Sequence, residues 1–302
     1  MSPAGRASLR EPVVGPGEEA LSETPRPVRA DVARCHREID DLTAAIFREH
    51  DYDFRHYARA SLERRLRACL ADEELLDFPA LQERIVRDPD CMQRVLLRLS
   101  IIVTAMFRDP SFFRALRVQA VPWLRTFPTV RSWVAGCSTG EEAYSLALLP
   151  QEEGLYERSR VYATDMSAAA LAKASAGIYP LAAMKQFTRN YLDAGGSGEL
   201  SRWYAANYGK AKMSGELKRN LVFAHHNLVT DGVFNEFHLV RCRNVMIFFD
   251  RDLQVRVHDL IYDSLAMFGI LGLGQKESLA FTPHESCYET MDSANKLYKK
   301  VK

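Results

Sequence analysis

Residues 130–149, VRSWVAGCSTGEEAYSLALL, combine three local patterns that occur together at the start of one kind of sheet. Segment 130–135 is short and largely apolar, and segment 144–149 has apolar residues at helical spacing. Between them Gly136 to Gly140 form a turn of small residues. A strand, a glycine turn and a helix in this order predict the first βα unit of a doubly wound sheet. Glycine at position 136 lets the backbone turn sharply and leaves room for a ligand at the strand's carboxyl end.

Two acids, Glu141 and Glu142, follow this turn at the start of the expected helix. The turn is not G-x-G-x-x-G and has no G-K-[ST], so it lacks the fingerprints of dinucleotide and phosphate loops. Two carboxylates would repel a pyrophosphate but suit a ligand with an ammonium group or hydroxyls, such as S-adenosylmethionine. An alternative is that both acids only favour the positive end of the helix dipole.

Composition narrows the class of protein. The 302 residues are 47% hydrophobic and 26% charged, which is typical of a globular protein with one small and one medium domain. The net charge of +1 argues against a nucleic-acid binder. Six scattered cysteines without a CxxC pattern favour a reducing, cytoplasmic location. We expect no export signal, no membrane insertion, no metal site and a monomer.

The N-terminal third divides into two parts. Residues 1–28 are rich in Pro, Gly, Ser and Glu, which predicts a disordered tail. Residues 29–106 predict a small all-α domain with four helices, and its second helix carries a basic surface that could bind an acidic partner or could simply be solvated. The four arginines expected on the outside or at the edges of that helix are Arg59, Arg64, Arg65 and Arg67.

Residues 107–302 predict the sheet domain. A second strand ends at Asp165, the place where an acid accepts ribose hydroxyls, although Asp165 or Ser167 could instead cap the next helix. Residues 181–219 are polar, basic and irregular, so we expect an inserted subdomain with short antiparallel strands near 203–206 and 210–213. Three further strands, near residues 220–225, 237–241 and 269–274, and a closing antiparallel pair near 287–289 and 296–301 suggest a seven-stranded sheet of the methyltransferase type rather than a dinucleotide-binding fold.

Four blocks of this chain, in the same order, resemble the signature blocks of the CheR-type protein-glutamate methyltransferases of bacterial chemotaxis: VTAMFRDPSFFRAL, WVAGCSTGEEAYSLAL, ATDMSAAALAKASAGIY and CRNVMIFFD. The resemblance runs from about residue 46 to 300. It implies an N-terminal helical domain, a class I methyltransferase domain and a β-subdomain inserted in it. It also implies S-adenosylmethionine as methyl donor, S-adenosylhomocysteine as product and the acidic helical region of a chemoreceptor as partner.

The resemblance also assigns residues. Glu142 would hold the methionine ammonium group, Asp165 the ribose, and Asn227 with Leu228 the adenine. Arg108, Arg243 and Asn244 would lie near the methionine end and the acceptor, where we expect the catalytic groups. The full set of expected cofactor-binding residues is Thr104, Arg108, Gly136, Glu142, Asp165, Asn227, Leu228, Arg243 and Asn244.

Two departures keep other functions open. The family often has Asn where this chain has Ile102, and often Tyr where it has Phe248. We therefore weigh three hypotheses: a methyltransferase that esterifies receptor glutamates, a methyltransferase for a different acceptor, and a scaffold that binds S-adenosylmethionine or its product and signals to a partner. A nicotinamide-dependent dehydrogenase fits worse, because its glycine fingerprint is missing.

Overall fold

A computed structural model describes the protein over residues 29–99 and 104–302. Contacts divide the chain into residues 1–37 and residues 38–302, and the described part of the first unit is the beginning of one helix. The expectations for residues 1–28 and for Ile102 lie outside the described residues. In the described part of the chain, no helix is both long and apolar enough to cross a membrane.

The N-terminal part consists of helices, as expected. The pattern predicted four helices, and four are present in the described residues 29–99. The third begins with Asp77, whose side chain accepts a hydrogen bond from the backbone N–H of Ala80 (2.9 Å), and with Pro79 in its first turn, a common helix start. The helices are α1 (Arg29–His50), α2 (Arg59–Asp72), α3 (Phe78–Arg87) and α4 (Pro89–Leu99).

The central sheet has seven strands in the order β6-β2-β1-β7-β8-β10-β9. The first five are mutually parallel, and β10 runs antiparallel to both β8 and β9. The expected doubly wound sheet of the methyltransferase type is therefore confirmed. The strands are β1 (Val130–Ala135), β2 (Ser159–Asp165), β6 (Leu221–His225), β7 (Phe237–Cys242), β8 (Leu265–Leu273), β9 (Tyr288–Asp292) and β10 (Leu297–Lys300).

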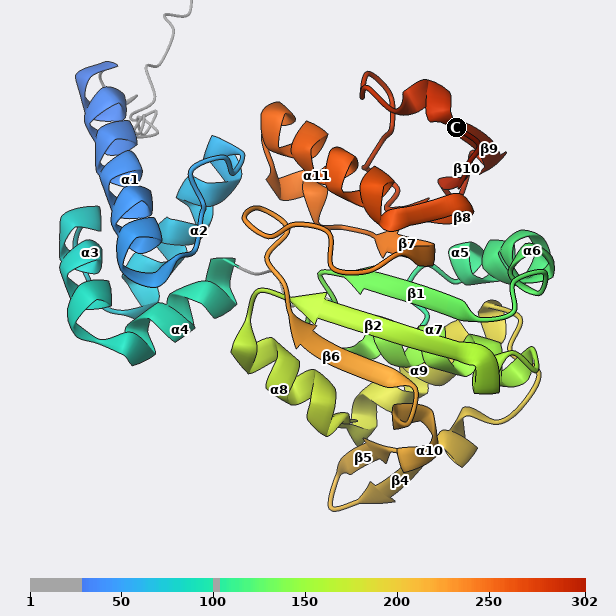
Figure 1. Cartoon of the computed structure of the whole chain (residues 1–302). Coiled ribbons are helices and arrows are strands. Elements are labelled where there is room, and N and C mark those ends of the chain that lie inside the picture. The colour runs from blue at the N-terminus through green and yellow to red at the C-terminus, as the bar shows by residue number, and fades with distance from the viewer. Residues whose placement is uncertain (1–28, 100–103) are drawn as a thin grey trace, which may run out of the picture. The chain divides into compact units, whose positions relative to one another are not determined.

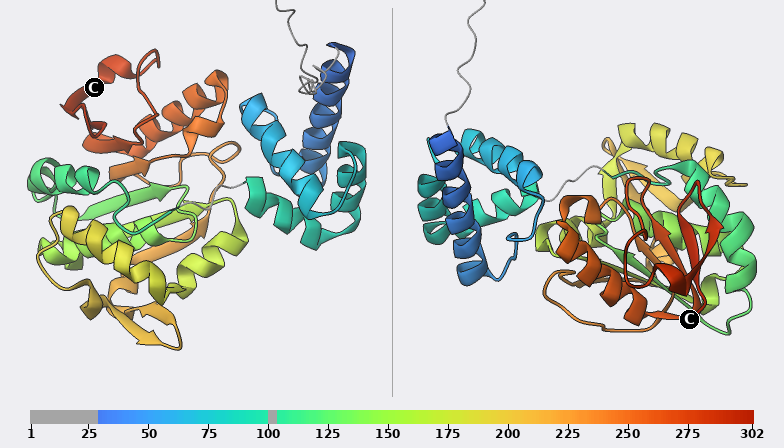
Figure 2. Two further views of the ribbon diagram at one scale, coloured as in Figure 1. Left: turned by 180° about the vertical axis from the view of Figure 1, so that it is seen from behind. Right: turned by 90° about the horizontal axis from the view of Figure 1, so that it is seen from above.

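Strand β1 shows how the sheet builds a core on each face. Successive side chains of a strand point to opposite faces, so Val134 enters one apolar cluster while Trp133 and Ala135 enter the other. The Val134 side is covered by α5, α7 and α9, and the other side by α11 (Figures 1 and 2). The helical elements that follow α4 are α5 (Pro110–Ala115), η1 (Leu116–Ala120), α6 (Val121–Leu124), α7 (Glu141–Glu152), η2 (Tyr156–Arg158), α8 (Ala168–Ala176), α9 (Leu181–Asp193), η3 (Leu200–Trp203), α10 (Gly215–Lys218), η4 (Met246–Phe248), α11 (Arg251–Ser264) and η5 (Glu285–Cys287).

The inserted subdomain is present but more regular than expected. Its three-stranded antiparallel sheet, in the order β3-β5-β4, contains β3 (Ile178–Pro180), β4 (Tyr204–Asn207) and β5 (Lys210–Met213), and the last two match the predicted strands. The expectation of an irregular segment after residue 181 is wrong, because α9 (Leu181–Asp193) occupies its first third and β4, β5 and α10 follow. Met184, Phe187 and Tyr191 recur at helical spacing and are buried against the core below the main sheet.

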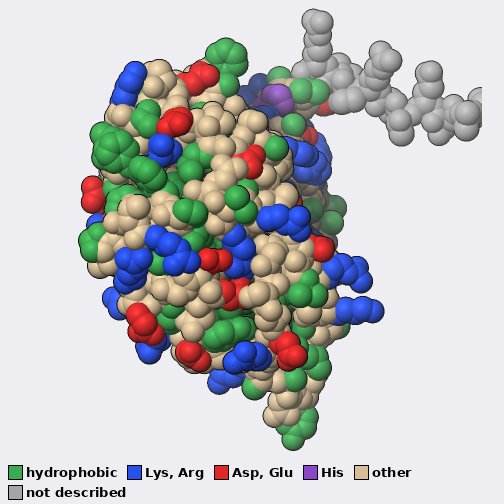
Figure 3. All heavy atoms as spheres, turned by 90° about the vertical axis from the view of Figure 1, so that its right-hand side faces the viewer, with side chains coloured by type: hydrophobic (Ala, Val, Ile, Leu, Met, Phe, Trp, Pro, Cys, Tyr) green, Lys and Arg blue, Asp and Glu red, His purple; other side chains and the backbone are tan. Residues whose placement is uncertain are grey.

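Charged side chains of both signs are interspersed on the face of the molecule drawn in Figure 3. This mixture agrees with the net charge of +1.

Candidate active site

The turn after β1 requires its first glycine. Gly136 has φ +71°, a conformation that favours glycine, and a Cβ atom at this position would lie 2.5 Å from the Cγ2 atom of Val245. At the other end of the turn, Gly140 has φ +92°, and a Cβ atom there would lie 2.7 Å from the Cβ of Ala174. The turn is therefore packed tightly between the loop after β7 and helix α8, which leaves its backbone at the edge of a cleft.

Asp165 ends β2 beside this turn, and its carboxylate is fixed by two backbone groups. One oxygen accepts the N–H of Ser138 (2.8 Å) and the other accepts the N–H of Ser167 (2.9 Å). Burial raises the pKa of Asp165, and these hydrogen bonds oppose that rise. The helix-capping role belongs to Ser167, whose hydroxyl accepts the N–H of Ala170 (3.2 Å). Because a carboxylate has about four lone-pair sites, Asp165 retains acceptor capacity toward the cleft.

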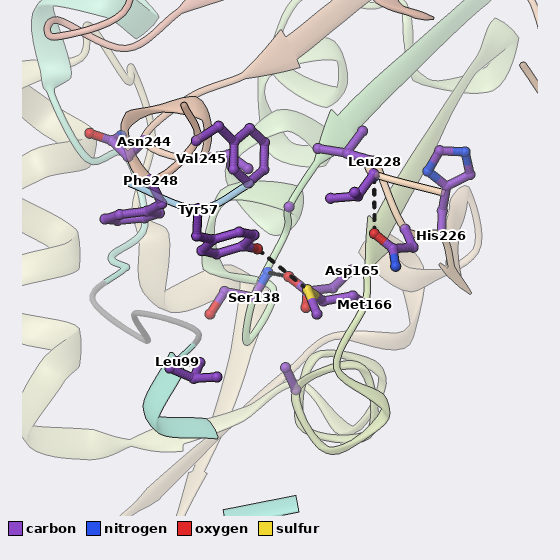
Figure 4. A pocket seen from close by; sticks show the side chains of 15 residues that line it. Tyr57, Leu99, Ser138, Asp165, Met166, His226, Leu228, Asn244, Val245 and Phe248 are labelled. Carbon is purple, nitrogen blue, oxygen red and sulfur yellow. Dashed lines mark hydrogen bonds between the residues drawn. The ribbon is translucent and has the colours of Figure 1, made fainter. Parts of the chain in front are cut away.

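The cleft at the carboxyl ends of β1, β2 and β7 encloses about 710 Å³, including space open to solvent. Five of the predicted cofactor-binding residues line it, and most of its other walls are apolar or aromatic (Figure 4). None of the described residues that line it is a lysine or an arginine, so the cleft suits a nucleoside rather than a phosphate. The five predicted residues are Gly136, Asp165, Asn227, Leu228 and Asn244.

The helical part of the chain also lines the cleft, which the sequence did not predict. The hydroxyl of Tyr57 lies 3.9 Å from the sulfur of Met166, and Leu99 is a further wall (Figure 4). Two backbone hydrogen bonds hold this segment to the end of η4 and the residues after it, from Ala58 N–H to Phe248 O and from Asp250 N–H to His56 O, both 2.8 Å. No local pattern in the sequence signals a contact between segments so far apart.

Glu142 and Arg243 each pair with a side chain of opposite charge. An oxygen of Glu142 lies 2.8 Å from a guanidinium nitrogen of Arg241, and Glu142 is not among the residues that line the cleft. The side chain of Arg243 is fully buried, and it donates to Asp109 (2.7 Å) and to the carbonyl of Leu273 (3.1 Å). Glu142 keeps 12% of its side chain exposed, whereas the Arg243 side chain is closed off from solvent.

Arg108 and Asn244 meet at the end of the cleft nearest the loop after β7. A guanidinium nitrogen of Arg108 donates to Oδ1 of Asn244 across 3.5 Å. Asn244 has φ +61°, in the left-handed region that Asn tolerates better than most residues. Thr104 is half-buried at the start of the same segment, which is anchored by a hydrogen bond from the N–H of Phe107 to the hydroxyl of Ser145 (2.8 Å).

The expected arginine surface of α2 needs one correction. Arg65 is buried at 7% exposure, donates to the carbonyl of Leu99 and stacks its guanidinium 4.1 Å from the ring centre of Phe248. It therefore cannot belong to a solvent-facing surface. Arg64 and Arg67 are exposed, and Arg67 pairs with Glu63 (2.8 Å), while Arg59 is half-exposed and pairs with Asp40.

The central sheet has the strand order β6-β2-β1-β7-β8-β10-β9, a glycine turn after β1, and Asp165 at the end of β2 where an acid can bind ribose hydroxyls. The cleft at its carboxyl edge has no lysine or arginine among its described lining residues. Together these features are the architecture of a class I S-adenosylmethionine-dependent methyltransferase. Residues 103–296 match the family described as "CheR methyltransferase, SAM binding domain", and residues 37–100 match "CheR methyltransferase, all-alpha domain". This chain belongs to the CheR methyltransferase family, and its cofactor is S-adenosylmethionine.

Several curated proteins are similar to this chain. Cher3 of Pseudomonas putida, a methyltransferase by name, is 44% identical over 263 residues, which cover 87% of this chain and 96% of its own. Chemotaxis protein methyltransferase 2 of Pseudomonas aeruginosa is 30% identical, over 74% of this chain and 78% of its own. The chemotaxis protein methyltransferase of Listeria innocua is 25% identical, over 79% and 88%.

Proposed function

We propose that this methyltransferase esterifies glutamate side chains of a chemoreceptor or a related signalling protein. The observation that carries the proposal is the Arg108–Asn244 pair beside the cleft, which would offer hydrogen-bond donors and a positive charge to an acceptor carboxylate. The names of the relatives in Pseudomonas aeruginosa and Listeria innocua, both chemotaxis protein methyltransferases, support the same class of acceptor.

The residues of the cleft fit the donor. Asp165 would accept the ribose hydroxyls, and Asn227 with Leu228 would flank the adenine, at the ends of β2 and β6. Gly136 keeps the turn free of a side chain, and Thr104 and Arg243 would act from the edge of the site. Glu142 would hold the methionine ammonium group while Arg241 keeps one of its oxygens in place.

The reaction requires little acid–base catalysis by the protein. A glutamate acceptor has a reference pKa near ~4.3 and is already ionised at neutral pH, so no general base is needed. Bound S-adenosylmethionine supplies a methyl group on a sulfonium, which is an activated leaving group. Arg108 and Asn244 would align the carboxylate with that methyl group, which is catalysis by proximity and orientation. The carboxylate loses its charge in the transition state, so Arg108 should orient it without binding it too tightly.

A protein substrate with rows of carboxylates needs a positive surface to bind. Of the four arginines considered, Arg64 and Arg67 on α2 are the exposed pair, and we propose that they face the acidic helices of the receptor. Such charges act mainly on encounter rate and specificity, and salt screens them over ~8 to 10 Å. Replacing both with Glu should therefore reduce methylation of the receptor more at low salt than at high salt, and should leave affinity for S-adenosylhomocysteine unchanged.

The proposal is tested with a receptor signalling fragment and its matched variant in which the acceptor glutamates are replaced by Ala. Mass spectrometry after incubation with S-adenosylmethionine should place methyl groups on glutamates of the first fragment and none on the second. Arg108→Ala should lower the rate at least about tenfold, since orientation supplies most of the acceleration. Methylation of Lys or Arg, or equal labelling of both fragments, would contradict the proposal.

A further inference from the structure

Glu277 binds the loop that carries Asn244 more extensively than a helix cap or a surface ion pair would. One carboxylate oxygen accepts the backbone N–H groups of Gly274 (2.6 Å) and Asn244 (3.0 Å), and the other accepts those of Val245 (2.8 Å) and Met246 (2.9 Å). The side chain is buried at 5% exposure. A single acid thus satisfies four backbone donors that would otherwise be buried without partners.

This carboxylate joins two neighbouring strands at the functional edge of the sheet. Cys242, the last residue of β7, pairs with Leu273, the last residue of β8, and the four donors follow directly after these two strands. A Cβ atom on Gly274 would lie 2.6 Å from the carboxylate and 2.9 Å from the backbone nitrogen of Asn244. Glycine at position 274 therefore leaves room for the carboxylate and the loop to approach each other.

Glu277 anchors Asn244, a residue with a left-handed backbone conformation. Asn244 has φ +61°, and its side chain faces Arg108 only while the backbone keeps that conformation. The carbonyl groups of the same loop have a different partner, because Gln254 on α11 donates to Met246 O and Phe249 O, both at 3.1 Å. Glu277 thus holds the beginning of the loop by its N–H groups, and Gln254 holds its end.

We propose that Glu277 is a positioning residue that holds Asn244 in place for donor binding and methyl transfer. Glu277 does not line the cleft, so it acts through Asn244 rather than on a substrate. The inference rests on the role assigned to Asn244 in binding the donor and not on glutamate as the acceptor. It is therefore tested by binding of S-adenosylhomocysteine, a readout that is independent of the protein substrate.

The experiment is a double-mutant cycle with Glu277→Gln, Asn244→Ala and the double variant, measured by calorimetric titration with S-adenosylhomocysteine. We expect each single variant to bind about tenfold more weakly, and the double variant to bind at most about twofold more weakly than Asn244→Ala, because coupled residues are not additive. Gln254→Leu is the control, since it releases the other end of the loop. It should lower the thermal midpoint yet leave affinity within about twofold of the wild type.

The proposal would be overturned if the two substitutions acted independently, so that the double variant bound S-adenosylhomocysteine about a hundredfold more weakly than the wild type. Glu277 would then be a general stabiliser of the fold. Unchanged affinity in a folded Glu277→Gln variant would overturn it as well. If Glu277→Gln does not fold, Gly274→Ala displaces the carboxylate by its added methyl group, and the same cycle with Asn244→Ala decides by the same criteria.

Discussion

The buried ion pair between Glu142 and Arg241 yields a prediction about stability whose size follows from burial. The Arg241 side chain is fully buried, and its guanidinium lies 4.7 Å and 4.6 Å from the ring centres of Phe112 and Phe113. Burial lowers its pKa to about 10, and the negative charge of Glu142 opposes this shift. Glu142 retains 12% exposure, so the two partners are buried to different extents.

Glu142→Leu should destabilise the protein more than Arg241→Met does. The leucine variant leaves a fully buried cation without a counter-ion, which costs about 3 to 5 kcal/mol. Coulomb attraction supports that scale, since two unit charges ~4 Å apart attract by about 4 kcal/mol at an effective dielectric constant of ~20. The methionine variant leaves a partly exposed carboxylate that water can reach, so we expect a loss of about 1 to 3 kcal/mol.

The assay is urea unfolding of both single variants and of Glu142→Leu with Arg241→Met. The double variant replaces the pair with apolar side chains and should lie within about 1 to 2 kcal/mol of the wild type, far less than the sum of the singles. Single variants that each lose under about 1 kcal/mol, and that add in the double variant, would refute the view that the pair is a buried, mutually dependent unit.

Three further predictions follow from single residues. Burial lowers the pKa of His258 to about 4, so between pH 6.5 and pH 4 the unfolded state binds more protons than the folded state. Acidification through that window should thus remove up to roughly 3 kcal/mol from the wild-type free energy of unfolding. In urea titrations, the His258→Phe variant should lack this part of the pH dependence. Identical pH profiles for the variant and the wild type would contradict the prediction. Asp165→Ala should weaken S-adenosylhomocysteine binding by about 1 to 3 kcal/mol in calorimetry, and unchanged affinity would remove the assignment of the ribose site. Phe248→Tyr should change turnover less than about tenfold and leave donor affinity alone, whereas a gain of a hundredfold, roughly 2.7 kcal/mol, would mean that the missing hydroxyl limits this enzyme.

Local sequence patterns predicted the sheet well because its strands are short apolar segments that end in polar residues. The β1 turn, Asp165 and the closing antiparallel pair all lie where the patterns indicated. Helix α9 was not predicted because polar residues dominate its segment, although the spacing of Met184, Phe187 and Tyr191 is a usable helical signal.

The burial and the partners of charged residues were harder to predict from the sequence. Arg65 lies three residues after Leu62 and directly before Leu66, so it shares the buried stripe of α2, and the spacing alone could have placed it there. Arg241 lies on the buried strand β7, where Glu142 and two aromatic rings contact its guanidinium. Glu277 lies more than thirty residues along the chain from most of the N–H groups it binds, and such a contact exists only in the folded structure.

The methyl group is expected to form an ester with a glutamate side chain, and the stability of the methylated product in base tests this most directly. Labelled methyl from S-adenosylmethionine is transferred to the receptor fragment, and the product is then treated with mild base. A glutamyl methyl ester should release its label as methanol, and the Arg108→Ala variant should yield little of it. Label that stays on the protein in base would mean methylation of lysine or arginine and would contradict the account.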